Sequence, residues 1–230
     1  MKKKIILFAL GILVGLLLSH WFHTRQKVSR APEAALASVE SNSHVLTMAD
    51  LEIPVKDLPT FQSYVSEQTD PKSEIERTHY EEIETDTEER FFLLQYSCGN
   101  KQCDSLLIKV HNREIESLPL PKGIFQDYQL APDQDKVLFR YAYNEGGQII
   151  RHVIVPVDLV KLESIPVASE ENRIQFMDDP TWPILEYEWI SSNIFLLVTA
   201  DLPSPDFNKL KTWYASDVKK SKTVDILLDE

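Results

Sequence analysis

Residues 136–143 read KVLFRYAY, a run built mainly of aromatic, β-branched and leucine side chains. Runs of the same kind stand at residues 91–97 (FFLLQYS) and 193–200 (NIFLLVTA), and a polar turn follows each of them. This composition favours a pleated backbone, and a run with so few polar residues is typical of a buried strand. The sequence therefore predicts three buried strands, one in each of three similar units.

Each buried run has other strand-like segments around it. One precedes it, at residues 80–85, 125–130 or 185–190, and two follow it, at residues 106–110, 153–157 or 210–215 and at residues 114–120, 161–167 or 222–228. The sequence ESLPL at residues 116–120 returns as ESIPV at residues 163–167, an offset of 47 residues. A repeat of this length is typical of a four-stranded antiparallel unit. We predict three such units, over residues 79–120, 125–167 and 184–228.

The turn before the second buried run carries a recognisable pattern. Residues 129–139 (QLAPDQDKVLF) resemble the strand, Ser-Pro-Asp-Gly-Lys turn and strand of the WD40-like repeats in TolB and in the propellers of prolyl-oligopeptidase relatives. Residues 188–193 (EWISSN) are similar to the Trp-Ser-x-Asp variant of that turn. Pro132 would fix φ at one corner, and Asp133 would accept a hydrogen bond from a backbone amide further along. The resemblance implies units that are blades of a β-propeller.

The predicted fold class is all-β, with about three four-stranded, propeller-blade-like repeats after an N-terminal transmembrane helix. The chain departs from the repeat pattern at Ala131 and Gln134, where Ser and Gly are usual. Closed propellers use at least four blades, and only three units can be found. Three arrangements stay open: a degenerate fourth blade built partly from the preceding segment, an open structure or β-sandwich, or a set of blades completed by a partner.

Composition and charge limit the class of partner. The chain has 230 residues, of which 43% are hydrophobic and 26% charged, with 13 Pro, 6 Gly and 2 Cys. These values exclude a collagen, a low-complexity disordered chain and a cysteine-rich scaffold. The net charge of -12 opposes contact with nucleic-acid phosphates, so we expect no nucleic-acid partner.

An apolar run near the N-terminus predicts a membrane anchor. Residues 5–18 read IILFALGILVGLLL, and the run extends to residue 22. At about 1.5 Å per residue, a helix over residues 5–22 is long enough to cross the hydrocarbon core. The lysines of residues 1–4 are expected to keep that tail in the cytoplasm, with the C-terminal domain outside a bacterial inner membrane, in the periplasm or at the cell surface. A cleaved secretory signal is the alternative, although no pair of small residues closely follows the run, and Ala35 and Ala37 are too distant from it.

Small residues mark one side of the predicted span. Gly11, Gly15 and Ser19 recur every four residues, which places them on one stripe of a helix. Such a stripe allows another helix to approach closely. We therefore expect a protein partner in the envelope that packs against this helix, or a second copy of the chain forming a homodimer.

Residues 23–77 are predicted to form an acidic stalk. Four prolines interrupt them between residues 32 and 71, hydrophobic periodicity is weak, and Asp and Glu dominate the charged residues. Such a segment buries too little surface to order itself. Short helical turns are expected only where Pro59 or Pro71 starts one, with Asp70 as the cap before Pro71. The β-repeat domain would then comprise residues 78–230.

Cys98 and Cys103 flank a predicted hairpin turn in the first unit. A short hairpin brings its two ends within reach of a disulfide, and the predicted exterior location is oxidising. A metal site would need further ligands, and a redox-active pair is usually Cys-x-x-Cys followed by a helix. The two cysteines are therefore predicted to form a structural disulfide.

No catalytic, metal or cofactor motif stands out. The six histidines are scattered, and neither Gly-x-Ser-x-Gly nor His-Glu-x-x-His occurs. We expect a protein that is not an enzyme and uses no cofactor. Among the aromatic residues of the third unit, Trp182 lies in a loop bounded by prolines and is the residue expected to contact a partner.

These features together predict a membrane-anchored, extracytoplasmic module that binds protein in an envelope assembly. Loops and exposed strand edges are the expected contact surfaces. Two alternatives come from other classes. One is an envelope hydrolase or an enzyme accessory, and the other is a β-domain that binds a small ligand or a glycan.

Overall fold

Antiparallel strands make up most of the folded chain. The computed structural model describes residues 44–99 and 102–229, with 51% strand and 19% helix. The sheets are antiparallel, and none closes into a barrel. The prediction of a chain dominated by antiparallel β-structure is confirmed. Val45–Glu230 form one compact unit.

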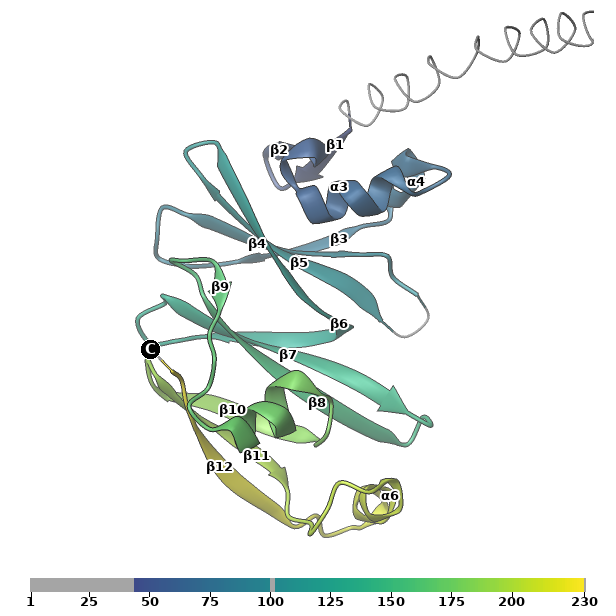
Figure 1. The fold of residues 1–230 in the computed structure, drawn as a ribbon, viewed down its shortest axis with the longest axis vertical. Helices are drawn as coiled ribbons and strands as arrows, with labels where there is room; N and C mark the ends of the chain where they lie inside the picture. The colour runs from purple at the N-terminus through teal and green to yellow at the C-terminus, as the bar shows by residue number, and fades with distance from the viewer. Residues whose placement is uncertain (1–43, 100–101, 230) are drawn as a thin grey trace, which may run out of the picture. The chain divides into compact units, whose positions relative to one another are not determined.

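Seven strands form a single sheet in sequence order, each antiparallel to the next. They are β3 (His79–Ile83), β4 (Arg90–Tyr96), β5 (Cys103–His111), β6 (Glu114–Leu130), β7 (Lys136–Glu145), β8 (Ile149–Asp158) and β9 (Glu163–Ser164). The long strand β6 is shared, because its residues up to Gly123 pair with β5 and those from Ile124 pair with β7. We call the part before this point the first layer and the part after it the second layer (Figure 1).

The first and second layers pack face to face. Phe91 of β4 lies in one buried cluster with Phe139 and Tyr141 of β7. At the bend of β6, an added Cβ on Gly123 would lie 3.1 Å from the Tyr143 ring. This is tighter than most side-chain contacts, so a larger residue where β6 passes between the layers would require Tyr143 to shift.

A second sheet forms the third layer. It contains β10 (Ile184–Ser191), β11 (Ile194–Ala200) and β12 (Ser221–Leu227), in that order. Phe195 and Leu197 of β11 are buried with Leu138 of β7 and Ile154 of β8. Because β7 and β8 are covered on one face by the first layer and on the other by the third, their sequences are apolar at consecutive positions.

Helical segments complete the core beneath the third layer. They are α5 (Glu170–Arg173), the π-helical turn η2 (Ile174–Asp178) and α6 (Phe207–Ala215). Phe176 of η2 and both Leu210 and Trp213 of α6 belong to the same buried cluster as β11. These segments therefore stabilise the junction between the second and third layers.

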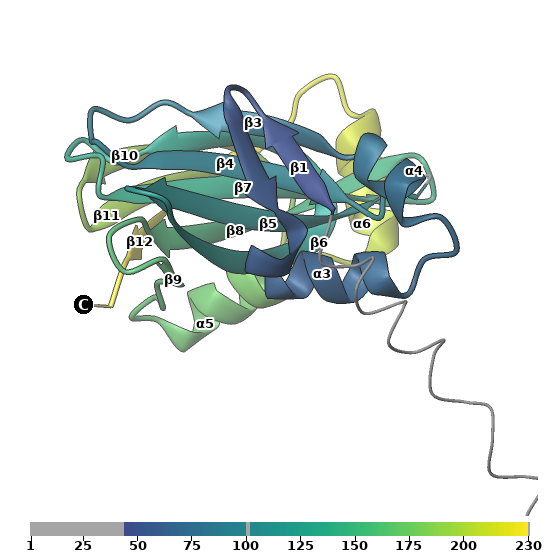
Figure 2. The same ribbon diagram turned by 90° about the horizontal axis from the view of Figure 1, so that it is seen from above.

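The N-terminal segment covers the other face of the first layer. It comprises β1 (Val45–Met48), β2 (Leu51–Pro54), the 3-10 turn η1 (Val55–Asp57), α3 (Pro59–Ser66) and α4 (Pro71–Glu76). Phe61 and Val65 of α3 are buried with Phe92 and Leu94 of β4. Figure 2, which looks down on this end, shows β1 and α3 lying over the first-layer strands.

The predicted stalk over residues 23–77 is therefore wrong from residue 45 onward. Phe61 and Val65 stand four residues apart on α3, so they share the helix face that packs on β4. The prolines start helices rather than preventing them, since Pro59 and Pro71 occupy first-turn positions. The predicted cap is confirmed, because the Asp70 side chain accepts from the Ser73 amide.

Two predicted strands of the repeats are also wrong. Residues 210–215 are helical, since they lie in α6. Leu210 and Trp213, three residues apart, share the buried side of that helix. Of the predicted strand over residues 161–167, only Glu163–Ser164 pair with β8. Because α6 replaces the expected third strand, β12 takes the third place in its layer and pairs directly with β11.

The turn between β6 and β7 follows the sequence prediction closely. Asp133 accepts a hydrogen bond from the amide of Asp135 at 3.3 Å. Gln134 has a φ of 61°, a left-handed conformation that favours Gly. Its side chain compensates, because it accepts from the Asp86 amide and donates to the Asp86 carboxylate, each at 2.7 Å. Gln134 thereby joins the β3–β4 turn to the β6–β7 turn.

The predicted tail over residues 1–4 and anchor over residues 5–22 lie outside the described residues, as do Gly11, Gly15 and Ser19. Within residues 44–99 and 102–229, no helix is long and apolar enough to cross a membrane.

Candidate interaction surface

The third layer has one buried face and one face turned to solvent. Phe195 and Leu197 on the buried face are fully enclosed, whereas Leu227 on the other face is 51% exposed. Since strand side chains alternate between faces, the cross-strand pairs identify the outward set. We call it the open face; it consists of Glu186, Glu188, Ile194, Leu196, Val198, Thr223, Asp225 and Leu227.

Cross-strand pairing gives the open face an apolar centre with acidic sides. Leu196 of the central strand pairs with Glu188 on one side and with Asp225 on the other. Val198 pairs with Glu186 on the β10 side, and both apolar residues line a hollow of about 560 Å³. The eight positions include three carboxylates and neither Lys nor Arg. Arg140 also lines the hollow, but it is paired with Asp127, so carboxylates remain in excess there. This face therefore suits a partner surface that is apolar and basic.

The opposite end of the stack of layers is covered in a different way. Phe92 and Leu94 of the first layer are fully buried, since α3 places Phe61 and Val65 over them. The third layer carries Leu196 and Val198 at equivalent central positions, and these are only partly buried. We call Leu196 and Val198 the apolar column. Apolar side chains that remain open to solvent at one end of such a stack are a typical feature of an interaction surface.

The outer strand β12 presents a free edge. In the third layer β10 and β12 are the edge strands. The edge of β10 is occupied by the second layer, because Gln129 Nε2 donates to the carbonyl oxygen of Tyr187 at 2.8 Å. On β12 only one end is tied, where Ala168 N donates to the carbonyl oxygen of Leu227 at 2.9 Å. Within the part of the chain that the structure describes, no strand pairs with residues 221–225 on that side.

A polar network holds β10 firmly on the second layer. Arg140 of β7 pairs with Asp127 of β6 and donates to the carbonyl oxygens of Ile184 and Leu185 at 3.2 and 3.3 Å. The Tyr187 hydroxyl donates to Asp127 at 2.9 Å, and the guanidinium lies 5.1 Å from the centre of the Tyr187 ring. Burial and the Asp127 carboxylate raise the pKa of Tyr187, so its hydroxyl remains a donor. The third layer is thus a fixed platform for the open face.

His152 of β8 lies at the same junction. Its Nδ1 accepts from the Ile184 amide at 3.0 Å, and its own amide donates to the Trp182 carbonyl oxygen at 2.8 Å. Burial and the nearby Arg140 lower the pKa of His152 to about 4, although Asp127 opposes them. The ring is therefore neutral at pH 7, and its proton is on Nε2 because Nδ1 is an acceptor.

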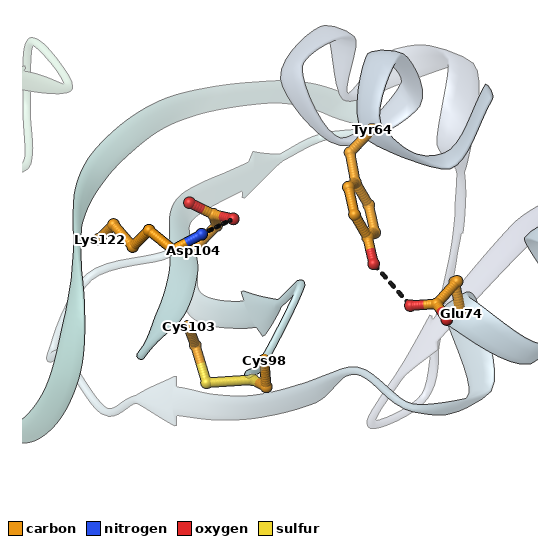
Figure 3. The surroundings of a disulfide bond; sticks show 6 residues. All are labelled: Tyr64, Glu74, Cys98, Cys103, Asp104 and Lys122. Atoms are coloured by element: carbon orange, nitrogen blue, oxygen red, sulfur yellow. Dashed lines mark hydrogen bonds and ion pairs between the residues drawn. A yellow bond between two sulfur atoms is a disulfide. The ribbon is translucent and has the colours of Figure 1, made fainter. Parts of the chain in front are cut away.

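The predicted disulfide between Cys98 and Cys103 is confirmed. Figure 3 shows it joining the end of β4 to the start of β5. The same view shows the Tyr64–Glu74 hydrogen bond of 2.5 Å that links α3 to α4. Burial and Glu74 raise the pKa of Tyr64 to about 12, which keeps the hydroxyl protonated. The disulfide belongs to the first layer and the hydrogen bond to the N-terminal segment that covers it, whereas the open face lies in the third layer.

Removing the disulfide is expected to destabilise the hairpin without unfolding the layers. Replacing Cys98 and Cys103 together by serine should lower the free energy of unfolding by about 2 kcal/mol, since a short loop gains entropy in the unfolded chain. Urea denaturation with and without a reducing agent measures this difference. The double variant should not respond to the reductant. A wild-type protein that is equally insensitive would contradict a stabilising role.

Trp182 is not the exposed loop contact that the sequence predicts. Its side chain is 6% exposed and belongs to the core cluster beneath the third layer. The Lys222 ammonium lies 5.6 Å from the centre of the indole ring and covers it further. Because Trp182 is buried in the core, the open face replaces it as the candidate contact surface.

Comparison with known proteins found no matching family model, no matching curated protein and no matching solved structure.

Proposed function

We propose that the chain is a membrane-anchored, extracytoplasmic protein-interaction module of an envelope assembly, and that it is not catalytic. The open face carries this proposal, because it joins a partly exposed apolar column to three carboxylates on one side of an antiparallel sheet. Such a combination favours burial against another protein, with the charges selecting the partner.

The blade-like resemblance supports the same function. We propose that the three layers are successive propeller-like blades, packed face to face and covered at one end by α3. In that arrangement the open face stands where a following blade would pack. A partner protein would supply the missing apolar cover, which is one of the arrangements that the sequence leaves open.

The location rests on the N-terminal sequence. The apolar run over residues 5–22 and the lysines of residues 1–4 support an anchor in a bacterial inner membrane with the folded domain outside. Gly11, Gly15 and Ser19 would allow the partner, or a second copy, to contact the anchor as well. Both contacts would then act within one membrane-bound complex.

Affinity capture of the full-length protein from membranes tests this function. The wild type is expected to recover a protein partner in stoichiometric amount, and Leu196→Lys is expected to reduce recovery by at least about tenfold, because it places an ammonium in the apolar column. Val160→Lys is the matched control, since Val160 is 62% exposed and lies outside the open face. No stoichiometric partner, or equal recovery with both variants, would overturn the proposal.

A further inference from the structure

The third layer lacks the strand that completes each of the other two. In the first layer β5 pairs with β6, and in the second layer β8 pairs with β9. The third strand of the third layer is β12, which corresponds to β5 and β8. It pairs with β11 and with no further strand among the described residues. Residues 166–168 meet only the end of β12, through the bridge between Val167 and Leu228, and no described strand lies beside residues 221–225. The sequence predicts a strand where α6 forms, and β12 takes the third position of the layer instead.

The free part of the β12 edge has a defined set of hydrogen-bonding groups. Ala168 N donates to the carbonyl oxygen of Leu227, so Leu227 directs its backbone groups away from β11. The amide and carbonyl of one residue point to the same side, and alternate residues share that side. Thr223 and Asp225 therefore direct their backbone groups to the free edge, which leaves room for a short added strand.

We propose that an extended segment of the partner protein pairs with β12 at Thr223 and Asp225 and forms the fourth strand of the third layer. This inference rests on the proposed function and specifies how the partner binds. Backbone hydrogen bonds would supply the attachment, as in other cases of strand addition to an exposed edge. The open face would then continue onto the added strand.

The side chains of β12 define the chemistry of that segment. Asp225 lies on the open face in the same row as Glu188, so a Lys or Arg of the added strand would stand opposite it. Val224 lies on the other face and is half-buried, which favours an apolar residue opposite. A second copy would instead bring another Asp225 to the same acidic row. The occupant is therefore a strand of a different protein, with basic and apolar residues in alternation.

A proline substitution separates the backbone contact from the side chain. Thr223→Pro removes an amide that points to the free edge and leaves the bonds between β11 and β12 in place. Capture of the membrane partner by the full-length protein is expected to fall about tenfold with Thr223→Pro and to stay near wild type with Thr223→Ala. An unchanged melting temperature of the proline variant shows that the layer is intact. Equal capture by both variants would overturn strand pairing.

A peptide probe tests the chemistry directly. A seven-residue peptide with alternating Lys and Val is added to the full-length protein in detergent, and hydrogen exchange is followed over Ser221–Leu227. Exchange is expected to slow about tenfold with this peptide and not with its Glu-Val counterpart. Equal protection by both peptides, protection by neither, or protection that rises with protein concentration alone would overturn the proposal.

The two proposals fail in different ways. If Leu196→Lys abolishes capture but Thr223→Pro does not, the open face binds a partner without strand addition. If neither substitution changes capture, the protein-binding function of this surface is wrong as well, and strand addition is wrong with it.

Discussion

Replacing Trp182 by alanine is expected to lower the free energy of unfolding by about 3–5 kcal/mol, the range for truncating a large buried aromatic side chain. The indole is 6% exposed and shares its core with Phe195 and Trp213. Its loss would leave a cavity between the second and third layers. Urea denaturation of the compact unit Val45–Glu230, monitored by circular dichroism, measures the change in the free energy of unfolding.

Ile190→Ala provides the control for this experiment. Ile190 lies on β10 of the same layer and is 57% exposed, so its truncation should change stability by less than about 0.5 kcal/mol. A Trp182→Ala protein that is as stable as wild type but no longer binds its partner would contradict the buried position. It would support the loop contact that the sequence predicts.

Stability is expected to fall as the pH drops from about 6.5 towards 4, because of His152. The pKa of His152 is held at about 4 in the folded protein, below the ordinary 6.5, mainly by burial and to a smaller extent by Arg140. As the pH falls, the unfolded chain therefore binds the proton before the folded protein does. The contribution of His152 to the free energy of unfolding is complete above pH 6.5 and is lost as the pH passes through 4. The full loss is about 3 kcal/mol, at about 1.4 kcal/mol for each unit of pKa.

His152→Gln isolates this effect. Glutamine remains neutral throughout and can accept the hydrogen bond from the Ile184 amide that Nδ1 of His152 accepts in the wild type. Melting temperatures measured between pH 7 and pH 4 should therefore fall less steeply for the variant, since carboxylates contribute equally to both proteins. Identical slopes for the two proteins would show that His152 does not titrate at the junction as we describe.

The buried strands β4 and β7 could be predicted from the sequence. In β4 and β7 neighbouring side chains enter different cores, such as Phe91 and Phe92 or Leu138 and Phe139, and this produces the apolar runs. The disulfide and the Asp133 turn could also be predicted, because each depends on residues close together in the chain.

The helices show where this reasoning fails. Aromatic and β-branched residues at 210–215 favour a strand, yet the spacing of Leu210 and Trp213 fits a helix and the tertiary core selects it. In the same way, the spacing of Phe61 and Val65 indicates a helix face, but the acidic residues and prolines around them suggest a stalk. Whether a short helix forms depends mainly on the surface it packs against. The local sequence carries no information about that surface.

The open face could not be predicted from the sequence. Leu196 and Val198 alternate with Phe195 and Leu197 in one apolar run, and nothing in the run distinguishes the covered set from the exposed set. The difference arises because α3 covers the first layer at one end, while no described segment covers the third layer in the same way. The acidic residues of β10 and β12 mark the exposed set only once the pairing is known.

Photocrosslinking from position 225 in intact membranes tests the central claim most directly, since this position joins the open face to the free edge of β12. A photoreactive residue there is expected to give one crosslinked product of defined mass with a different protein, and the same residue at position 160 is expected to give none. Crosslinks from position 160 alone, or a product of twice the mass of this chain from position 225, would contradict it.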